Sequence, residues 1–376
     1  MMPNTLARRT QTYFQLNTKL AYLNQEQIST LFENALETTR GWGINHVVQL
    51  ENSKVFIKRV PLTALEYQHP FSTKNHFGLP TYYNYGVGSA GFGTYRELLT
   101  QIKTTNWVLS GACEHFPLLY HYRVMPRSVP ETPLNVEGYE QYVTYWNSNE
   151  QIGKYALERR NAPYEIVLFL EYFPHTLGDW YRHNVEKTES IVAQMADVLA
   201  FLRKHGVRHL DLGFQNILSD GERIYVADFG LALDGAFELS AAERQFFETH
   251  ELFDYLPFLR SLAYYVAIKF NEQTEAQKQA LVAKYGLGGS ELTSRDRSIL
   301  LENLVQLREE GELPLEQNFV EMIVTHIELV RFAQTFYGAL FDNDTKDAVY
   351  DHARLRALLE SAEFLKSADS THQTSV

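Results

Sequence analysis

The chain has 376 residues, of which 45% are hydrophobic and 21% are charged, which suffices for a sizeable core in one large or two small domains. Its formal net charge of −12 argues against an extended surface for nucleic acid or anionic membrane. A single cysteine, Cys113, excludes a disulfide within the chain and fits a reducing compartment.

The first 60 residues have the pattern of a polar extension followed by short strands. Residues 1–36 are mainly polar, and the segment 24–36 places its apolar residues on one face of a helix: Ile28, Leu31, Phe32 and Leu36. Two β-rich runs follow at 46–50 and 54–58, with the turn-like Glu-Asn-Ser between them. We therefore expect a helix in the extension and then two strands.

The middle of the chain alternates irregular and regular segments. Residues 61–93 are rich in Pro, Gly, Tyr and Asn and predict an irregular insertion. A helix is predicted at 94–109, and strands at 116–124 and 165–173. Between those strands, residues 127–163 form a polar, aromatic-rich insertion without a clear period.

Helices predominate in the second half of the chain. Their apolar spacing predicts segments at 189–204, 253–270, 273–285, 295–310, 315–341 and 347–364. The polar tail at 366–376 is expected to be disordered. A strand-rich front and a helical back predict an α+β protein.

Two short motifs carry the chemistry. The sequence His-Leu-Asp-Leu-Gly-Phe-Gln-Asn occupies 209–216, and Asp-Phe-Gly occupies 228–230 after eleven further residues. Strand-like runs at 217–218 and 224–226 lie between them. Both motifs, in this order and at this separation, resemble the catalytic loop and the metal-binding motif of the protein kinase superfamily.

That resemblance implies a two-lobed fold with nucleotide bound in the cleft between the lobes. The small β-rich lobe is assigned to 37–173, after the extension at 1–36, and the insertions at 61–93 and 127–163 fall within it. The larger helical lobe is assigned to 174–365.

The kinase pattern also predicts where the lysine that binds the ATP phosphates lies in the chain. The run Val-Phe-Ile-Lys at 55–58 matches the family's V-A-I-K pattern except at its second position, so Lys58 is expected to hold the α- and β-phosphates. Glu97, 39 residues further on, is the candidate that fixes this lysine, and the insertion at 61–93 accounts for the separation. Glu66 competes, but it lies close to Lys58 and lacks a convincing helix.

Glycines for the phosphate loop occur at two places. Gly41 and Gly43 precede the lysine strand, where the family carries its glycine-rich loop, although the third glycine of the pattern is absent. The stretch 86–93 holds a literal G-x-G-x-x-G but follows the lysine. We favour Gly41 and Gly43 as cofactor-binding, and 86–93 stays the alternative cover for the phosphates.

The strand at 165–173 resembles the last strand of the small lobe running into the hinge. The adenine of ATP is then expected to bond to backbone groups of Glu171 and Phe173, with Leu170 facing the back pocket. An ordinary buried strand followed by a loop has the same local sequence.

The resemblance gives each motif residue a role. Asp211 accepts the hydrogen bond of the substrate hydroxyl, and Asn216 and Asp228 bind Mg²⁺. His209 is expected to be structural, and Gly230 to let the chain turn. Lys58 and the metal would neutralise charge on the transferred phosphoryl group.

Three departures from the family pattern affect function. Leu210 stands where an arginine usually grips a phosphorylated activation loop, so we expect activity without that phosphorylation. Gly213 stands where Ser/Thr kinases keep a lysine, and no Ala-Pro-Glu follows the Asp-Phe-Gly motif. These departures indicate a divergent bacterial or effector-like kinase.

Three functions fit the sequence. The first is an ATP- and Mg²⁺-dependent Ser/Thr protein kinase with a protein substrate. The second is a small-molecule kinase of the aminoglycoside or choline type, and the third is a pseudokinase that acts as a binding module. No nucleic-acid partner and no membrane span are expected, and the predicted location is the bacterial cytosol, or the host cytosol for a delivered effector.

Overall fold

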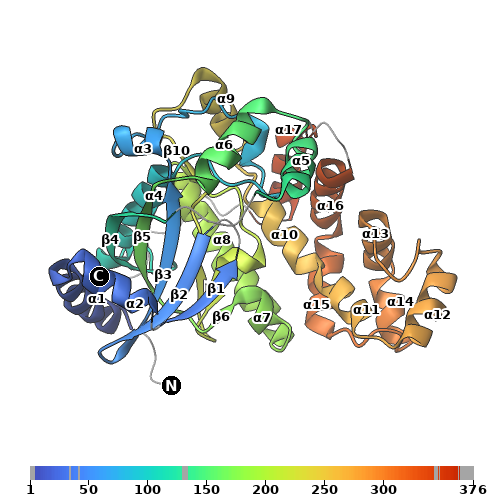
Figure 1. Ribbon diagram of the computed structural model, residues 1–376. Coiled ribbons are helices and arrows are strands. Elements are labelled where there is room, and N and C mark those ends of the chain that lie inside the picture. The colour runs from blue at the N-terminus through green and yellow to red at the C-terminus, as the bar shows by residue number, and fades with distance from the viewer. Residues whose placement is uncertain are drawn as a thin grey trace. The chain divides into compact units, whose positions relative to one another are not determined.

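The computed structural model describes residues 5–33, 35–40, 43–128, 134–342, 346, 348–362 and 364, with only the backbone at 36–40, 43 and 342. The chain divides into two compact units, Met1–Pro174 with Tyr225–Glu248, and His175–Ile224 with Thr249–Val376. A small antiparallel sheet precedes a larger helical portion, which confirms the predicted α+β class (Figure 1). The expected lobe ranges did not include the return of 225–248 to the first unit.

A five-stranded antiparallel sheet forms the centre of the first unit. Its order is β1 (Leu36–Arg40), β2 (Gly43–Leu50), β3 (Ser53–Leu62), β5 (Tyr164–Glu171) and β4 (Leu119–Pro126). The four predicted strands are present, with ends shifted by a few residues. β3 is the longest because its apolar run continues past Lys58 to Leu62.

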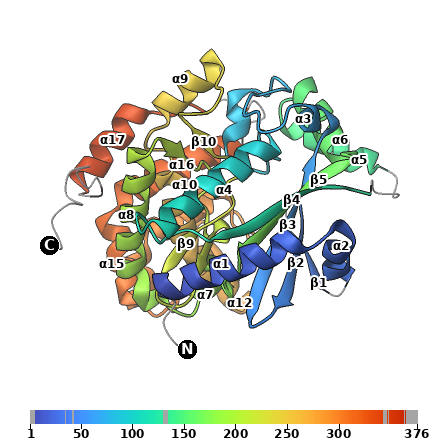
Figure 2. The ribbon, with the colours of Figure 1, turned by 90° about the vertical axis from the view of Figure 1, so that its left-hand side faces the viewer.

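The predicted N-terminal extension contains a regular helix that we did not predict, α1 (Leu6–Tyr22). Thr5 begins it by accepting a hydrogen bond from the Arg8 amide, and Leu16 and Leu20 lie one turn apart on its buried face. α1 packs along β4 (Figure 2). A second helix, α2 (Gln25–Glu33), occupies most of the predicted segment 24–36.

Both predicted insertions contain regular structure. The first contains α3 (Ala64–Gln68) and a 3₁₀ turn, η1 (Thr81–Asn84), and the second contains α5 (Val136–Tyr145) and α6 (Glu150–Arg160). Asn135 and Asn149 cap the two longer helices with their side chains. We missed these helices because their faces are largely aromatic and polar, which obscures the helical period.

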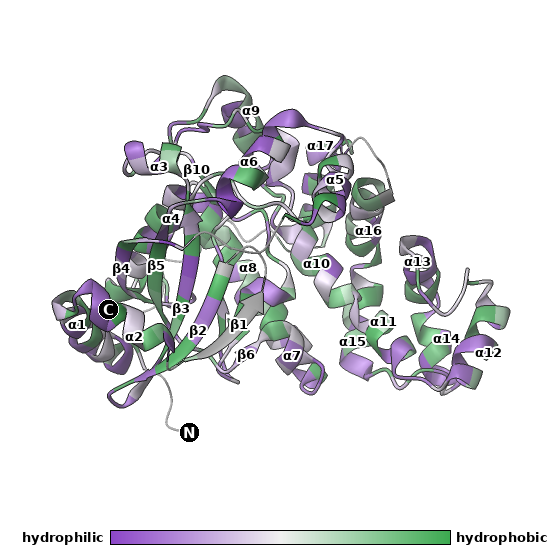
Figure 3. Ribbon diagram, viewed as in Figure 1, coloured by the Kyte–Doolittle hydropathy of each residue, from purple (hydrophilic) through white to green (hydrophobic). Residues whose placement is uncertain are grey.

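Helix α4 (Thr94–Leu109) has the predicted bounds and packs on the sheet. One apolar cluster joins them, made of Val60, Leu62, Tyr95, Leu98, Leu119, Ile166 and Leu168. Figure 3 shows hydrophobic and hydrophilic residues interspersed along the strands, as expected for a sheet with one covered face. This cluster fixes β3 and α4 relative to each other.

The second unit is helical. It contains α7 (Leu177–Tyr181), α8 (Thr188–Lys204), α12 (Glu275–Tyr285) and α17 (His352–Ser361), with β6 (His175–Thr176) paired to β8 (Ile217–Ser219). The ends of the predicted helix 347–364 and the tail 366–376 include residues outside the described part. No helix in the described part of the chain is long and apolar enough to cross a bilayer.

Three predicted long helices are each two shorter ones. They are α10 (Tyr255–Ala263) with α11 (Tyr265–Asn271), α13 (Ser294–Glu302) with α14 (Leu304–Glu309), and α15 (Gln317–Thr325) with α16 (Ile327–Asp342). At Asn303 the backbone leaves the helical region and the side chain bonds to the Ile299 carbonyl. His326 leaves it as well, with φ −112° and ψ 24°.

Replacing Leu98 tests the cluster that joins α4 to the sheet. Leu98→Ala should lower the free energy of unfolding by about 2–5 kcal/mol, because the side chain is fully buried in that cluster. Its neighbour Leu99 is half-buried and outside the cluster, so Leu99→Ala should cost clearly less. Urea denaturation of both full-length variants measures this, and equal losses would contradict the assignment.

Candidate active site

The structure brings together three of the predicted site residues in the first unit. Lys58 lies on β3, Glu97 in the first turn of α4, and Asp228 after strand β9 (Ile224–Val226). The Lys58 Nζ atom lies 2.6 Å from Glu97 Oε1 and 2.8 Å from Asp228 Oδ1. One ammonium group therefore bridges two carboxylates that are far apart in sequence.

The three charges differ in their exposure. The side chains of Lys58 and Glu97 are 16% and 7% exposed, whereas that of Asp228 is 46% exposed. Burial lowers the pKa of Lys58, but the carboxylates of Asp228 and Glu97 more than offset this and hold it above its ordinary value. Burial raises the pKa of Glu97, and the Lys58 charge opposes that rise.

The backbone at Asp228 has an unusual conformation. Its φ is 61°, a left-handed value that a non-glycine residue adopts at some energetic cost. The Asp228 Oδ1 atom accepts a hydrogen bond from the Gly230 amide at 3.3 Å as well as from Lys58. A Cβ at Gly230 would lie 3.4 Å from Asp228 Oδ1 and 3.5 Å from Glu97 Oε2. The glycine thus leaves room beside both carboxylates.

The glycine-rich stretch 86–93 lies against this motif. Gly91 has φ +87°, and a Cβ there would lie 2.5 Å from the Gly230 carbonyl oxygen. Two tyrosines hold the stretch, because the Ala90 amide donates to Tyr83 Oη and Tyr145 Oη donates to the Val87 carbonyl. The stretch therefore contacts the Asp-Phe-Gly motif directly and then leads into α4.

The other predicted glycine loop is only partly described. Gly43 is the first residue of β2 and pairs with Arg40 of β1, whereas Gly41 lies outside the described residues. Glu66, the competitor of Glu97, takes part in a capping box with Thr63 and accepts a hydrogen bond from the Thr94 amide. It therefore supports the start of α4, and Glu97 is the residue that contacts Lys58.

The predicted hinge lies at the end of β5. Glu171 is the last residue of that strand, and its amide donates to the Leu118 carbonyl. The Phe173 ring stacks on Tyr225 with 3.9 Å between centroids. Leu170 pairs with Phe56 of β3 and packs against the apolar cluster between α4 and the sheet.

The second unit contains the other two predicted residues, which contact each other. The Asn216 Nδ2 group donates to both the backbone oxygen and Oδ2 of Asp211, each at 2.8 Å. Asn216 ends a 3₁₀ turn, η3 (Phe214–Asn216), immediately before β8. Since both bonds use the amide nitrogen, the amide oxygen of Asn216 keeps its capacity to bind a cation.

A buried carboxylate that we did not identify from the sequence holds this loop. Asp254 accepts hydrogen bonds from the His209 amide at 2.8 Å and from the Leu210 amide at 2.6 Å. Burial raises the pKa of Asp254, and the adjacent His209 opposes that rise. The sequence offers one signal, an aspartate inside the otherwise apolar run where α10 begins.

Leu210 and Gly213, at which the loop 209–216 departs from the kinase pattern, each have a structural setting. Leu210 is fully buried and has φ 67°, so an apolar side chain replaces the family's arginine in a strained backbone position. At Gly213 a Cβ would lie 2.4 Å from the Gln215 side-chain amide. The Gln215 side chain therefore covers the position where the family places its lysine.

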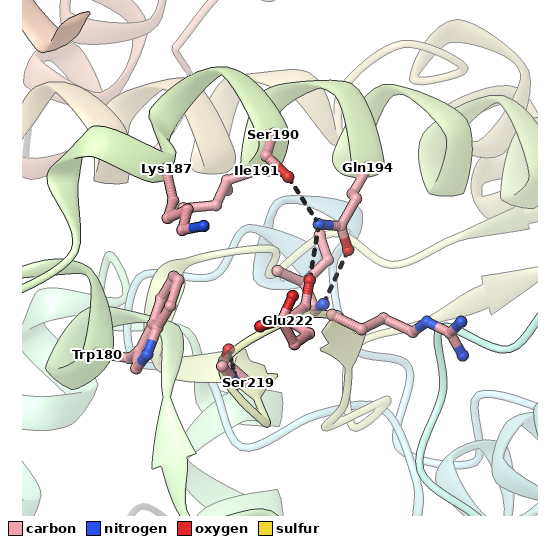
Figure 4. Close-up of a pocket in the computed structure, with 10 residues that line it drawn as sticks. Trp180, Lys187, Ser190, Ile191, Gln194, Ser219 and Glu222 are labelled. Atoms are coloured by element: carbon pink, nitrogen blue, oxygen red, sulfur yellow. Dashed lines mark hydrogen bonds between the residues drawn. The ribbon is translucent and has the colours of Figure 1, made fainter. Parts of the chain in front are cut away.

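A hollow in the second unit lies beside the start of α8 (Figure 4). It is lined by Trp180, Lys187, Ser190, Ile191, Gln194, Ser219, Gly221, Glu222, Arg223 and Ile224. The Gln194 side chain crosses it, donating to Ser190 Oγ and the Glu222 carbonyl and accepting from the Ile224 amide. None of the predicted site residues lines it, so we assign it no part in catalysis.

Comparison with known proteins gives a partial match. No family model matches the chain. Part of it is similar to myosin light chain kinase 2, skeletal/cardiac muscle, from Bos taurus, Homo sapiens and Oryctolagus cuniculus, each 38% identical over 80 residues. The match covers 19% of this chain and 13% of those relatives. This similarity points to a relationship with protein kinases.

Two glycines allow a matched test of the 86–93 contact. Gly91→Ala should lower the free energy of unfolding by roughly 1–3 kcal/mol more than Gly88→Ala, because a methyl group would overlap the Gly230 carbonyl. Gly88 is the control, since its φ is +98° and a Cβ there would meet no other described group within 4 Å. Urea denaturation gives both values. Equal destabilisation would show that only the positive φ matters.

Proposed function

We propose that this protein is an ATP- and Mg²⁺-dependent phosphotransferase that acts on serine or threonine hydroxyls of proteins. The observation that carries the proposal is the Lys58 ammonium group between Glu97 and Asp228. The partial similarity to a protein kinase agrees with it.

Lys58 is the proposed ligand of the nucleotide phosphates. Its pKa lies above the ordinary value, so the group carries a full positive charge at neutral pH. Glu97 is largely buried and holds the ammonium from α4, while the more exposed Asp228 shares it. Phosphate oxygens can replace Asp228 at Lys58 and leave the Glu97 contact in place.

Asp228 and Asn216 are the proposed metal ligands. No three His, Cys, Asp or Glu side chains in the described part of the chain gather closely enough to hold a metal ion by themselves. Mg²⁺ does not need such a cage, since one or two carboxylates with substrate phosphates and water suffice. The exposed Asp228 carboxylate and the Asn216 amide oxygen fit that donor set. Mg²⁺ would neutralise charge that develops on the phosphoryl oxygens.

Asp211 is the proposed group that orients the substrate hydroxyl. Asn216 holds the carboxylate through a hydrogen bond to Oδ2 at 2.8 Å, and the proposed role of this carboxylate is to accept the hydroxyl proton. Asp254 holds the preceding backbone, so the loop is preorganised by buried hydrogen bonds. Proton transfer to such a positioned carboxylate contributes on the order of 10²–10⁴ in rate.

The segment after the Asp-Phe-Gly motif supports activity without phosphorylation. Glu243 forms a buried ion pair with Arg96 of α4 at 2.7 Å, and Asp234 pairs with Lys103 of α4 at 2.6 Å. These acidic residues tie the segment to the helix that carries Glu97. A phosphorylated residue would supply the same kind of contact in a regulated kinase.

Phosphate transfer from labelled ATP tests the proposal. With Mg²⁺ and generic protein acceptors, the full-length protein should label protein, and chelation of the metal should abolish labelling. Lys58→Met and Asp211→Asn should each reduce the rate by about 10²-fold or more. Lys154→Met is the control, since Lys154 is exposed on α6 and its replacement should leave the rate unchanged.

Other results of this labelling assay would favour the small-molecule kinase or the binding module instead. Turnover only with small aminated or hydroxylated compounds would replace the protein substrate by a small molecule. Nucleotide binding without turnover would indicate a binding module. Labelling that survives both Lys58→Met and Asp211→Asn would contradict the assigned site.

A further inference from the structure

The side chain of Arg9 lies in the interior of the first unit. It projects from α1, is 1% exposed, and makes an ion pair with Glu171 of β5, which is 7% exposed. The Arg9 Nε atom donates to Glu171 Oε1 at 3.0 Å, and Nη2 donates to Oε2 at 2.8 Å. This two-pronged contact uses the planar geometry that only a guanidinium group provides.

Arg9 also binds the segment that leads into β4. Its Nη1 atom donates to the Glu114 carbonyl at 2.7 Å, and Nη2 donates to the Phe116 carbonyl at 2.5 Å. The Glu171 carboxylate in turn accepts a hydrogen bond from the Leu118 amide at 3.2 Å. Residues 114–118 and the end of β5 are therefore joined through one buried cation.

An aromatic ring also contacts the Arg9 side chain. The Arg9 guanidinium carbon lies 5.1 Å from the centroid of the Tyr225 ring, and the same ring stacks on Phe173. Phe173 is two residues after Glu171, so Arg9 contacts the start of the segment 171–173 directly and its end through the Tyr225 ring. Both side chains are almost fully buried, so removing the Arg9 guanidinium would leave the Glu171 charge in the interior without its countercharge, which is strongly unfavourable.

We propose that Arg9 is a positioning residue for the nucleotide base, because it fixes the backbone of 171–173 to which a planar heterocycle would hydrogen-bond. This inference rests on the proposed function. It makes α1 part of the nucleotide site, although Arg9 does not itself touch the nucleotide. The proposed binding of the nucleotide phosphates does not depend on Arg9, because the contacts that Lys58 and Gly230 make with Asp228 do not involve Arg9.

Two ligands separate base recognition from phosphate recognition. Binding of MgATP and of magnesium tripolyphosphate to the full-length protein is measured by calorimetry. Arg9→Met should weaken MgATP about tenfold or more, equivalent to about 1.4 kcal/mol, and change tripolyphosphate binding less than about twofold. Arg8→Met is the matched control, since Arg8 is the exposed neighbour on the same helix, and neither affinity should change.

A milder variant keeps the test valid if Arg9→Met does not fold. Arg9→Lys keeps the charge and loses the two-pronged contact, and should weaken MgATP selectively by about threefold or more. Equal weakening of both ligands, or unchanged MgATP affinity in a folded Arg9 variant, overturns the inference alone. A wild-type protein that binds neither ligand overturns the proposed function, and the inference with it.

Discussion

One ammonium group shared by two carboxylates is the constraint on which the site depends. Lys58 with Glu97 and Asp228 leaves a local net charge of −1, and Asp228 is the exposed member. When phosphate oxygens take the lysine, that carboxylate needs another cation, which is the condition under which a metal–nucleotide complex binds more favourably than free nucleotide. Under the proposed function, a ligand that brings phosphate and metal together would suit this arrangement of charges.

The rest of the first unit holds these charges in place. The apolar cluster around Leu98 fixes α4 to β3. Glu66 holds the first residue of α4 by accepting a hydrogen bond from the Thr94 amide. Gly91 allows the preceding stretch to lie against Gly230. In the second unit Asp254 fixes the loop 209–216 by accepting hydrogen bonds from two consecutive amides. Contacts distant in sequence thus hold the elements that carry the candidate site residues.

The sequence predicted features that depend on neighbouring residues and missed contacts between residues far apart in the chain. The resemblance to kinase motifs is a short-range pattern, and it selected Lys58, Glu97 and Asp228, where Lys58 contacts both carboxylates. It also selected Asp211 and Asn216, which contact each other in the second unit. Arg9 was assigned to a polar extension because its partner Glu171 is 162 residues away. Asp254 lies 44 residues from Leu210, and its place in an apolar run was the one local signal of its burial. The aromatic helices α5 and α6 were missed because their apolar period is weak.

A crystal structure with Mg²⁺ and a non-hydrolysable ATP analogue tests the central claim most directly. The account predicts Lys58 Nζ within hydrogen-bonding distance of a phosphate oxygen with the Glu97 contact retained. It also predicts a metal ion bound by the Asp228 carboxylate and the Asn216 amide oxygen, at the roughly 2.1 Å typical of Mg²⁺. A nucleotide bound elsewhere, or a metal ion that contacts neither residue, would contradict it.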